Sequence, residues 1–340
     1  MPGFKDIVGQ AHIRGILQRA VRDHSVSHAY MLAGEEHAGK TFVARVFAQA
    51  LVCERKGADG EPCGECPSCK KVIADAHPDV RVVVHEKESS IRVQEIIEQL
   101  VRDAYLTPYA AERKIYIVPD AQLMTRDAQN KLLKTLEEPP SYVTILLLTT
   151  GTEAMLQTVK SRCVPLMLRP VPTPELEAFL KETRGTSDYK ASLAARFARG
   201  NTGRALQYAA DPSFEARARE TMRLMETLSG MAIPSVNKRL MEIAEQGETE
   251  RGVREEVMHL IRCLLRDLMF YKATGEKDRL ILGEQWEYIR DTAAGTSFRQ
   301  LTELGEALRT ARGRIEANVN PAYAMELFFL AARDRLGEGK

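Results

Sequence analysis

The eight residues GEEHAGKT, from Gly34 to Thr41, constrain the fold more strongly than any other stretch of this chain. They match G-x-x-x-x-G-K-[ST], a loop whose backbone amides close around phosphate oxygens. A strand-like apolar run (27–34) precedes the loop and a helical pattern follows it, as the motif requires. Lys40 is then expected to reach the β- and γ-phosphates of a nucleotide, and Thr41 to bind its Mg²⁺. With Gly34 and Gly39, these residues predict a nucleotide-binding site. A chance match in a glycine-containing turn is the alternative.

The alternation of strand and helix continues through the first half of the chain. Apolar strands that take turns with helical patterns are typical of a parallel sheet covered by helices on both faces. Strands are expected at 79–85, 114–118, 142–150 and 163–170, and helices at 92–104 and 126–140. Pro139 and Pro140 end the last of these helices, because proline disfavours helix in the residue before it.

The pattern changes after the fifth expected strand. Thr173 is expected to cap a helix whose first residue is Pro174, and no further strand pattern follows. A later stripe carries apolar residues at helical spacing: Val257, Leu260, Ile261, Leu264, Leu265 and Leu268. We therefore predict an α/β nucleotide-binding domain over 1–172, an all-α lid over 173–211 and an all-α collar domain over 212–340.

The stretch KIYIVPDAQLMT (114–125) begins like a strand that delivers acidic residues to a nucleotide's magnesium. In phosphate-loop nucleotidases an aspartate at the end of such a strand holds the ion, and a glutamate commonly follows it to orient water. Pro119 and Asp120 occupy these positions here. Proline has no side-chain oxygen, and aspartate is one methylene shorter than glutamate. We predict a pocket that binds nucleotide but hydrolyses it weakly or not at all. The alternative is that Asp120 itself holds the metal after a local shift of the strand.

Four of the six cysteines fall close together in the pattern C-x9-C-x2-C-x2-C: Cys53, Cys63, Cys66 and Cys69. In a reducing compartment such a cluster is more typical of a metal site than of disulfides. Four thiolates form a closed tetrahedral set that suits structural zinc, whereas catalytic zinc needs an open position. The spacing predicts a Zn²⁺ module at 53–69, with free surface thiols as the alternative.

Two arginines stand where a ring-forming nucleotidase would use them. Arg162, in SRC (161–163), follows the fourth expected strand. An arginine there can point into a neighbouring subunit's pocket and stabilise charge on the γ-phosphate. Arg204, in GNTGRAL (200–206), begins a helix of the small domain, where it can bind the phosphates of this chain's own nucleotide. For both, an ordinary solvated surface charge is the alternative.

Composition argues against a membrane role and limits any DNA contact to a local one or one shared with partners. The net charge of +1 gives no overall field that would draw the chain to nucleic acid or to an anionic membrane. No apolar run approaches the roughly 20 residues needed to span a bilayer. The start, MPGFKDIVGQ, lacks the basic and apolar regions of a signal peptide. We expect a cytoplasmic protein with no membrane partner.

Taken together, FKDIVGQ, SHAYMLAGEEHAGKT, the four-cysteine module, AQNKLLKTLEEPP and SRC resemble the clamp-loader subunits of bacterial DNA polymerase III. These subunits belong to the AAA+ class, and among them the chain is most similar to the delta′ type. The resemblance is close over about the first 210 residues. Beyond that it rests on length and helical character alone.

The resemblance implies a pentamer of one delta, one delta′ and three gamma or tau subunits, which loads the sliding clamp onto primer-template DNA with ATP bound by gamma/tau. This chain would be the stator that lends Arg162 in trans to a neighbouring ATPase pocket. Its own pocket would hold ATP or ADP with Mg²⁺, approached at the adenine by Ile7, Val8 and Gly9, and the four cysteines would bind zinc.

Two other functions stay open at this point. A gamma/tau-type ATPase motor is one, although those subunits carry the acidic pair that Pro119-Asp120 replaces. Many delta′ sequences have a damaged phosphate loop, whereas the loop here is complete. The other is a zinc-bearing nucleotide-binding scaffold outside replication. The chain is not expected to polymerise DNA, because no cluster of metal-binding carboxylates for that chemistry is visible. Any polymerase activity would belong to the holoenzyme.

Overall fold

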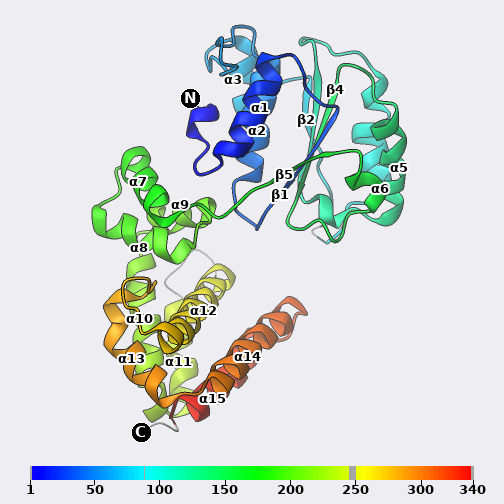
Figure 1. Cartoon of the computed structure of the whole chain (residues 1–340). Helices are drawn as coiled ribbons and strands as arrows, with labels where there is room; N and C mark the ends of the chain where they lie inside the picture. The colour runs from blue at the N-terminus through cyan, green and yellow to red at the C-terminus, as the bar shows by residue number, and fades with distance from the viewer. Residues whose placement is uncertain (1, 88, 245–249, 338–340) are drawn as a thin grey trace. The chain divides into compact units, whose positions relative to one another are not determined.

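A computed structural model of the chain describes residues 2–87, 89–244 and 250–337 (Figure 1). The chain forms two compact units. The first contains the residues up to Gly185 together with Ala198–Leu206, and the second contains Thr186–Phe197 and the residues from Gln207 onward. The division into three domains stays a prediction. The residues of the expected lid, 173–211, are shared between the two compact units.

The first unit is built on a five-stranded sheet in the order β2-β3-β4-β1-β5, with every pair parallel. Its strands are β1 (Ala29–Ala33), β2 (Val80–Val82), β3 (Lys114–Val118), β4 (Val143–Thr149) and β5 (Val164–Met167). The predicted parallel α/β fold is confirmed, although β2 is shorter than the expected 79–85. Because parallel strands end at one edge of the sheet, the phosphate loop after β1 lies near the ends of β4 and β3.

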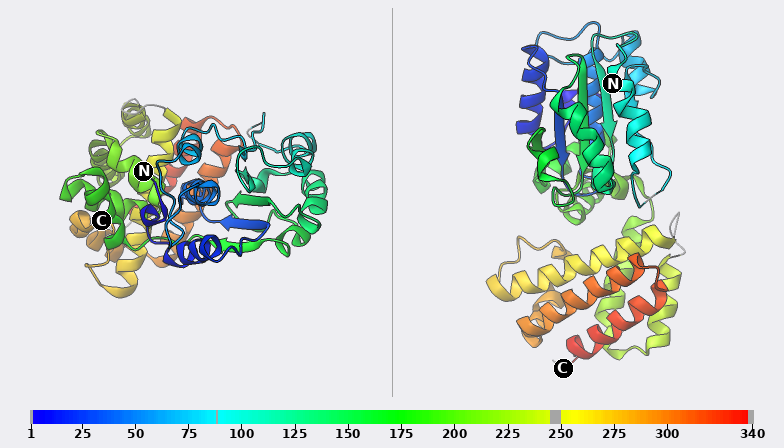
Figure 2. Two further views of the ribbon diagram at one scale, coloured as in Figure 1. Left: turned by 90° about the horizontal axis from the view of Figure 1, so that it is seen from above. Right: turned by 90° about the vertical axis from the view of Figure 1, so that its right-hand side faces the viewer.

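Helices cover both faces of this sheet (Figures 1 and 2). Alternate strand residues point to opposite faces, so Leu32 and Leu148 pack in one core with α1 and α2, while Met31 and Leu147 pack in the other with α5 and α6. The helices of this unit are α1 (Ala11–Arg22), α2 (Lys40–Val52), α3 (Pro67–Ile73), α4 (Val93–Ile96), α5 (Arg126–Glu137), α6 (Gln157–Lys160) and α7 (Thr173–Arg184). The helix α9 (Thr202–Ala210) contributes to both units.

Two expected helices differ in detail. The single helix expected at 92–104 is wrong: α4 gives way to a π-helical turn (Ile97–Val101) and then to a 3₁₀ turn (Asp103–Tyr105). The side chain of Gln99 accepts from the amide of Val84 at 2.8 Å and donates to its carbonyl at 2.6 Å, so it holds the π turn to the chain beyond the edge strand β2. The helix α7 has Pro172 as its cap, so Thr173 is its first residue and not the cap.

The described part of the second unit contains helices and no strand. Its helices are α8 (Asp188–Ala198), α10 (Phe214–Thr227), α11 (Ile233–Ala244), α12 (Glu250–Thr274), α13 (Trp286–Gly295), α14 (Phe298–Glu316) and α15 (Pro321–Gly337). The expected apolar stripe lies on α12, and all six of its residues are buried. In the described ranges, no helix is both long enough and apolar enough to cross a membrane.

Candidate nucleotide and metal sites

The phosphate loop closes around the side chain of its own lysine. The ammonium of Lys40 donates to the carbonyls of Gly34 at 2.8 Å and Glu35 at 2.7 Å. Gly39 has a φ of +93°, a left-handed conformation that favours glycine, and α2 starts at the next residue. The hydroxyl-bearing Thr41 lies in the first turn of α2. The structure therefore brings the four predicted loop residues together at the N-terminus of a helix, a favourable place for phosphate.

The end of β3 carries no metal-binding carboxylate in the position of the missing aspartate. Pro119 follows the last strand residue, Val118. Asp120 is exposed, has a left-handed φ of +47° and accepts a hydrogen bond from the side-chain amide of Gln122 at 3.2 Å. The carboxylate of Asp120 is nevertheless close enough to Lys40 to act on its pKa, which burial lowers and Asp120 raises in part.

The end of β4 is a part of the site that the sequence analysis missed. Thr149 is fully buried, its carbonyl accepts from the amide of Gly34 at 3.1 Å, and its hydroxyl donates to the carbonyl of Gly151 at 2.5 Å. The next residue, Thr150, donates its amide to the side chain of Gln122 at 3.1 Å. The sequence carried no signal for this contact, because it depends on the strand order, in which β4 lies between the phosphate-loop strand and β3.

Arg204 lies beside the phosphate loop, at the start of α9. Its guanidinium is 3.8 Å from the carboxylate of Glu35. Two preceding residues also contact the loop: the side-chain amide of Asn201 donates to the carbonyl of Glu36 at 2.7 Å, and the amide of Gly203 donates to the carbonyl of His37 at 2.9 Å. Sequence reasoning missed these partners. Phosphate binding by Arg204 stays a prediction.

The three residues expected near the adenine follow a 3₁₀ turn (Phe4–Asp6). Ile7 is buried and Val8 is half-buried. Gly9 has a φ of +66°, and an added Cβ there would lie 2.4 Å from the side chain of Val171, so glycine is required by both conformation and space. The structure does not test whether these residues contact a nucleotide.

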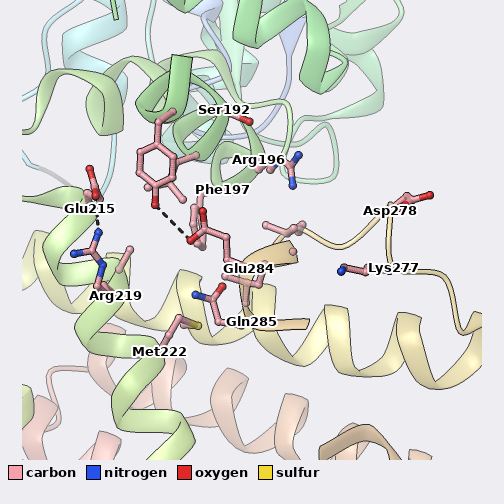
Figure 3. Close-up of a pocket in the computed structure, with 16 residues that line it drawn as sticks. Ser192, Arg196, Phe197, Glu215, Arg219, Met222, Lys277, Asp278, Glu284 and Gln285 are labelled. Atoms are coloured by element: carbon pink, nitrogen blue, oxygen red, sulfur yellow. Dashed lines mark hydrogen bonds and ion pairs between the residues drawn. The ribbon is translucent and has the colours of Figure 1, made fainter. Parts of the chain in front are cut away.

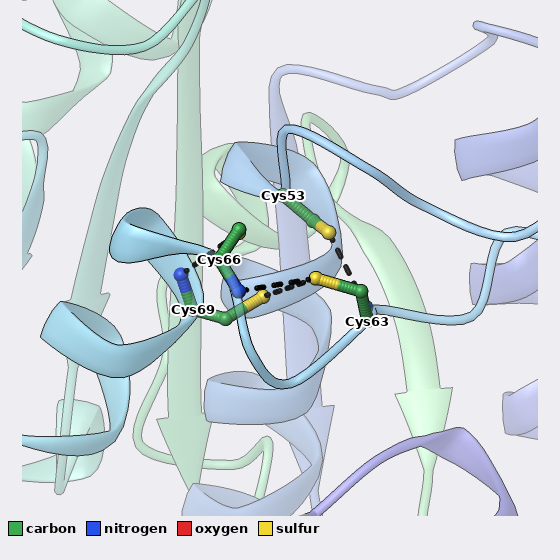
Figure 4. A group of neighbouring side chains, drawn as sticks. All are labelled: Cys53, Cys63, Cys66 and Cys69. Atoms are coloured by element: carbon green, nitrogen blue, oxygen red, sulfur yellow. Dashed lines mark hydrogen bonds between the residues drawn. The ribbon is translucent and has the colours of Figure 1, made fainter.

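The four cysteines converge as predicted, with their Sγ atoms all within 4.8 Å of one another (Figure 4). The Sγ atoms of Cys63 and Cys69 are 3.9 Å apart. Tetrahedral zinc with bonds of about 2.3 Å places its sulfur ligands roughly 3.8 Å apart. The chemistry and the spacing of this donor set therefore fit a bound metal ion. Cys53 caps the end of α2, and Cys66 caps the start of α3.

Backbone amides point at three of the sulfur atoms. The amides of Cys63, Cys66 and Cys69 donate to the Sγ atoms of Cys53, Cys63 and Cys66 at 3.3, 3.3 and 3.4 Å. Hydrogen bonds from the amides of Glu65 and Cys66 lower the pKa of Cys63 to about 6. Burial raises the pKa of Cys53 and of Cys69. A bound cation would favour the thiolate form of all four.

Arg162 lies between α6 and β5 with its side chain one-third exposed. Its guanidinium forms an ion pair with Glu137, the last residue of α5, at 2.7 Å, and donates to the carbonyl of Thr158 at 2.8 Å. These contacts hold the side chain at the surface without burying it. The adjacent Cys163 is buried, as expected, and burial raises its pKa to about 12.

The second unit contains a cavity of about 430 Å³ that the sequence analysis did not foresee (Figure 3). Its wall is mixed in charge: Arg219 pairs with Glu215 at 2.6 Å, and the hydroxyl of Tyr189 lies 3.5 Å from the carboxylate of Glu284. No residue that the sequence analysis singled out for binding or catalysis lines this cavity.

Comparison with known proteins agrees with the fold and the motifs. Residues 9–172 match the family described as "DNA polymerase III, delta subunit". The DNA polymerase III subunit delta′ of Bacillus subtilis is 27% identical over 328 residues, which span 96% of each chain. The subunit tau/gamma of Haemophilus influenzae is 37% identical over 166 residues, which are 49% of this chain and 24% of the relative.

A solved structure, a DNA polymerase III gamma subunit-related protein from Thermotoga maritima, shares the fold with a TM-score of 0.51 at 19% identity. The match covers 94% of this chain and 99% of that one. The match to a delta′ subunit covers 96% of the chain, whereas the match to tau/gamma covers 49%, which favours the delta′ type over the motor type. The chain is thus similar to a DNA polymerase III delta′ subunit along nearly all of its length, and its residues 9–172 match the DNA polymerase III delta-subunit family.

Proposed function

We propose that this chain is the delta′-type stator of a clamp loader. In this role it helps load the sliding clamp onto primed DNA without driving the reaction with its own ATP. The observation that carries the proposal is Pro119 at the end of β3, beside the phosphate loop. A motor subunit needs a carboxylate there to hold Mg²⁺. In this proposal Asp120 does not take over that role: it lies one residue further along the chain, is exposed and accepts from the side chain of Gln122.

Arg162 is the residue that we propose acts on a neighbour. It is exposed enough to reach another chain, and its contacts with Glu137 and Thr158 limit the number of conformations that the long side chain samples. A preorganised arginine costs less entropy when it meets a phosphate. An arginine supplied in trans to phosphoryl transfer accelerates the reaction by about 10³–10⁵ where such effects are known.

The cofactors follow from the two sites. Zn²⁺ is proposed for the four cysteines, as a structural ion that ties together a polar segment with little apolar core of its own. ATP or ADP with Mg²⁺ is proposed for the phosphate loop, held by Lys40 and Thr41. The partners would be the delta and gamma/tau subunits, the sliding clamp and, within the complex, primer-template DNA. The net charge of +1 predicts weak DNA binding by the isolated chain.

The decisive experiment measures ATP hydrolysis by the reconstituted loader with clamp and primed DNA. Arg162→Ala in this chain is expected to lower turnover tenfold or more, about 1.4 kcal/mol of transition-state stabilisation. Lys160→Ala is the matched control, because it removes a positive charge two residues away on the same short segment. Gel filtration verifies that each variant assembles.

The possible outcomes separate the functions. A loss of turnover with Arg162→Ala but not with Lys160→Ala supports a stator with a trans-acting arginine. No loss in either variant removes Arg162 from the mechanism. ATP hydrolysis by the isolated chain at the rate of the complex would instead favour the gamma/tau-type motor, with Asp120 as its metal ligand.

A further inference from the structure

The phosphate loop carries two carboxylates within its own sequence. The side chains of Glu35 and Glu36 are 73% and 69% exposed. Burial lowers the pKa of Lys40, and the charges of Asp120, Glu36 and Glu35 oppose that effect. Three carboxylates are therefore close enough to Lys40 to act on its charge, and one of them, that of Glu35, also pairs with Arg204. Such a balance disfavours a polyanion in a site that otherwise has the geometry to bind one.

The lid segment fixes the backbone of this loop. Asn201, which is buried, donates its side-chain amide to the carbonyl of Glu36, and Gly203 donates its backbone amide to the carbonyl of His37. His37 has a left-handed φ of +62°, a strained conformation for a residue with a side chain. A Cβ on Gly203 would lie 2.4 Å from the carbonyl oxygen of His37, so only glycine allows this approach. The loop and the lid are in direct backbone contact.

This contact places Arg204 opposite Glu35. The backbone amide of Arg204 donates to the side chain of Asn201 at 3.1 Å, which fixes the first turn of α9. The guanidinium then lies 3.8 Å from the carboxylate of Glu35, with the arginine side chain 21% exposed. A nucleotide phosphate that binds Arg204 has to displace this carboxylate or share the arginine with it.

We propose that Glu35 is a specificity-determining residue of the phosphate loop: it is an internal counter-ion for Arg204 and lowers the affinity for nucleoside triphosphate more than for diphosphate. The third phosphate gives the triphosphate more charge to gain from Arg204, so the competition of Glu35 for this arginine lowers its affinity more. The inference rests on the nucleotide binding proposed above for the chain's own pocket, and it does not depend on the role of Arg162.

The test is a titration of the purified full-length chain with fluorescent mant-ATP and mant-ADP in the presence of Mg²⁺. Glu35→Gln is expected to tighten mant-ATP binding about fivefold, the effect of one charge contact near 4 Å in a well-solvated site. The gain for mant-ADP should be about half as large or less. Glu36→Gln is the matched control: it removes the same charge from the neighbouring position, which does not contact Arg204, and should give a smaller gain.

A second pair of variants tests the counter-ion itself. In an Arg204→Ala background, Glu35→Gln should change mant-ATP binding by less than twofold, because the ion pair no longer exists. Equal gains with and without Arg204, or no gain from Glu35→Gln, would overturn the proposal. So would the absence of mant-nucleotide binding in every variant at millimolar concentration. Thermal melting verifies that each variant folds. None of these outcomes bears on the role of Arg162, which the loader ATPase assay tests separately.

Discussion

Asp79 offers a prediction whose size can be worked from the structure. Its carboxylate is buried and accepts three backbone N–H groups, those of Tyr109 at 2.6 Å, Ala110 at 2.7 Å and Ala111 at 2.8 Å. These bonds hold the loop that precedes β3. The loop presents Leu106 and Tyr109, whose side chains are largely exposed. Asp79 is thus the main polar support of a loop that has little core of its own.

Replacing Asp79 with Asn keeps the volume but removes the charge and one acceptor oxygen. One hydrogen bond to a charged group, worth about 1.5–3 kcal/mol, is lost, and the other two become neutral bonds worth roughly 0.5–1.5 kcal/mol each. The expected destabilisation of the first unit is about 4.5 kcal/mol. For a domain of 150–250 residues, this lowers the melting temperature by roughly 9–18 °C.

The same carboxylate predicts a pH dependence. Burial would raise the pKa of Asp79, but the three amides outweigh it and hold the pKa below its ordinary value. A lowered pKa in the folded state means that the stabilisation is complete above the unfolded value of about 3.9 and is lost as pH falls through the folded value. The gap between wild type and Asp79→Asn should therefore be constant from pH 5 to 8 and narrow below about pH 4.

Differential scanning calorimetry at several pH values measures both effects, and hydrogen exchange of the amides of residues 109–111 reports on the loop itself. Asp75→Asn is a suitable control, because Asp75 pairs with Arg45 on the surface and should cost less than about 1 kcal/mol. A loss below 1 kcal/mol for Asp79→Asn, or a gap that widens as the pH falls, would refute the reasoning.

Two further predictions concern the metal and the second unit. A chelator should release about one zinc ion per chain, measured colorimetrically. It should also expose residues 54–65 to proteolysis, because the cysteines are themselves the small core of that module. A segment that stays resistant to protease, with no zinc released, would contradict this prediction. Arg217→Met should lower the free energy of unfolding, measured by urea denaturation, by about 3–5 kcal/mol. The guanidinium of Arg217 binds the two carboxylate oxygens of Glu256 at 2.7 and 3.0 Å, and the substitution leaves this largely buried carboxylate without that partner. Arg219→Met, at an exposed pair, should cost less than 1 kcal/mol.

What the sequence predicted well was local in the chain. The phosphate loop, the four-cysteine module and the parallel strands each depend on residues within a short window, where spacing and apolar pattern decide the geometry. The order of expected strands and helices then left little choice of fold class. The helix expected at 92–104 was predicted incorrectly because apolar periodicity does not distinguish a π turn from an α turn. The π turn is held by the contacts of Gln99 with Val84, and these contacts form only when the chain has folded.

The contacts that the sequence could not reveal join distant segments. Asn201 and Glu36 are 165 residues apart, and no pattern in either segment indicates the other. The same holds for the support of Arg162 by Glu137. Glu35 and Glu36 were visible as residues, but their meaning depends on where Arg204 lies. Motifs identified the chemistry of the site, whereas only the structure shows which charges already occupy it.

The helix α2 separates the phosphate loop from the four-cysteine cluster within the first unit. It starts at Lys40 in the phosphate loop and ends against Cys53, the first candidate metal ligand, after 13 residues or about 20 Å. Buried residues occur on all sides of this helix, as expected of a rigid core element. A metal ion would fix its far end, while the lid and Glu35 act at its near end. In the proposed role of stator, this arrangement would place the nucleotide at one end of α2 and the structural metal ion at the other.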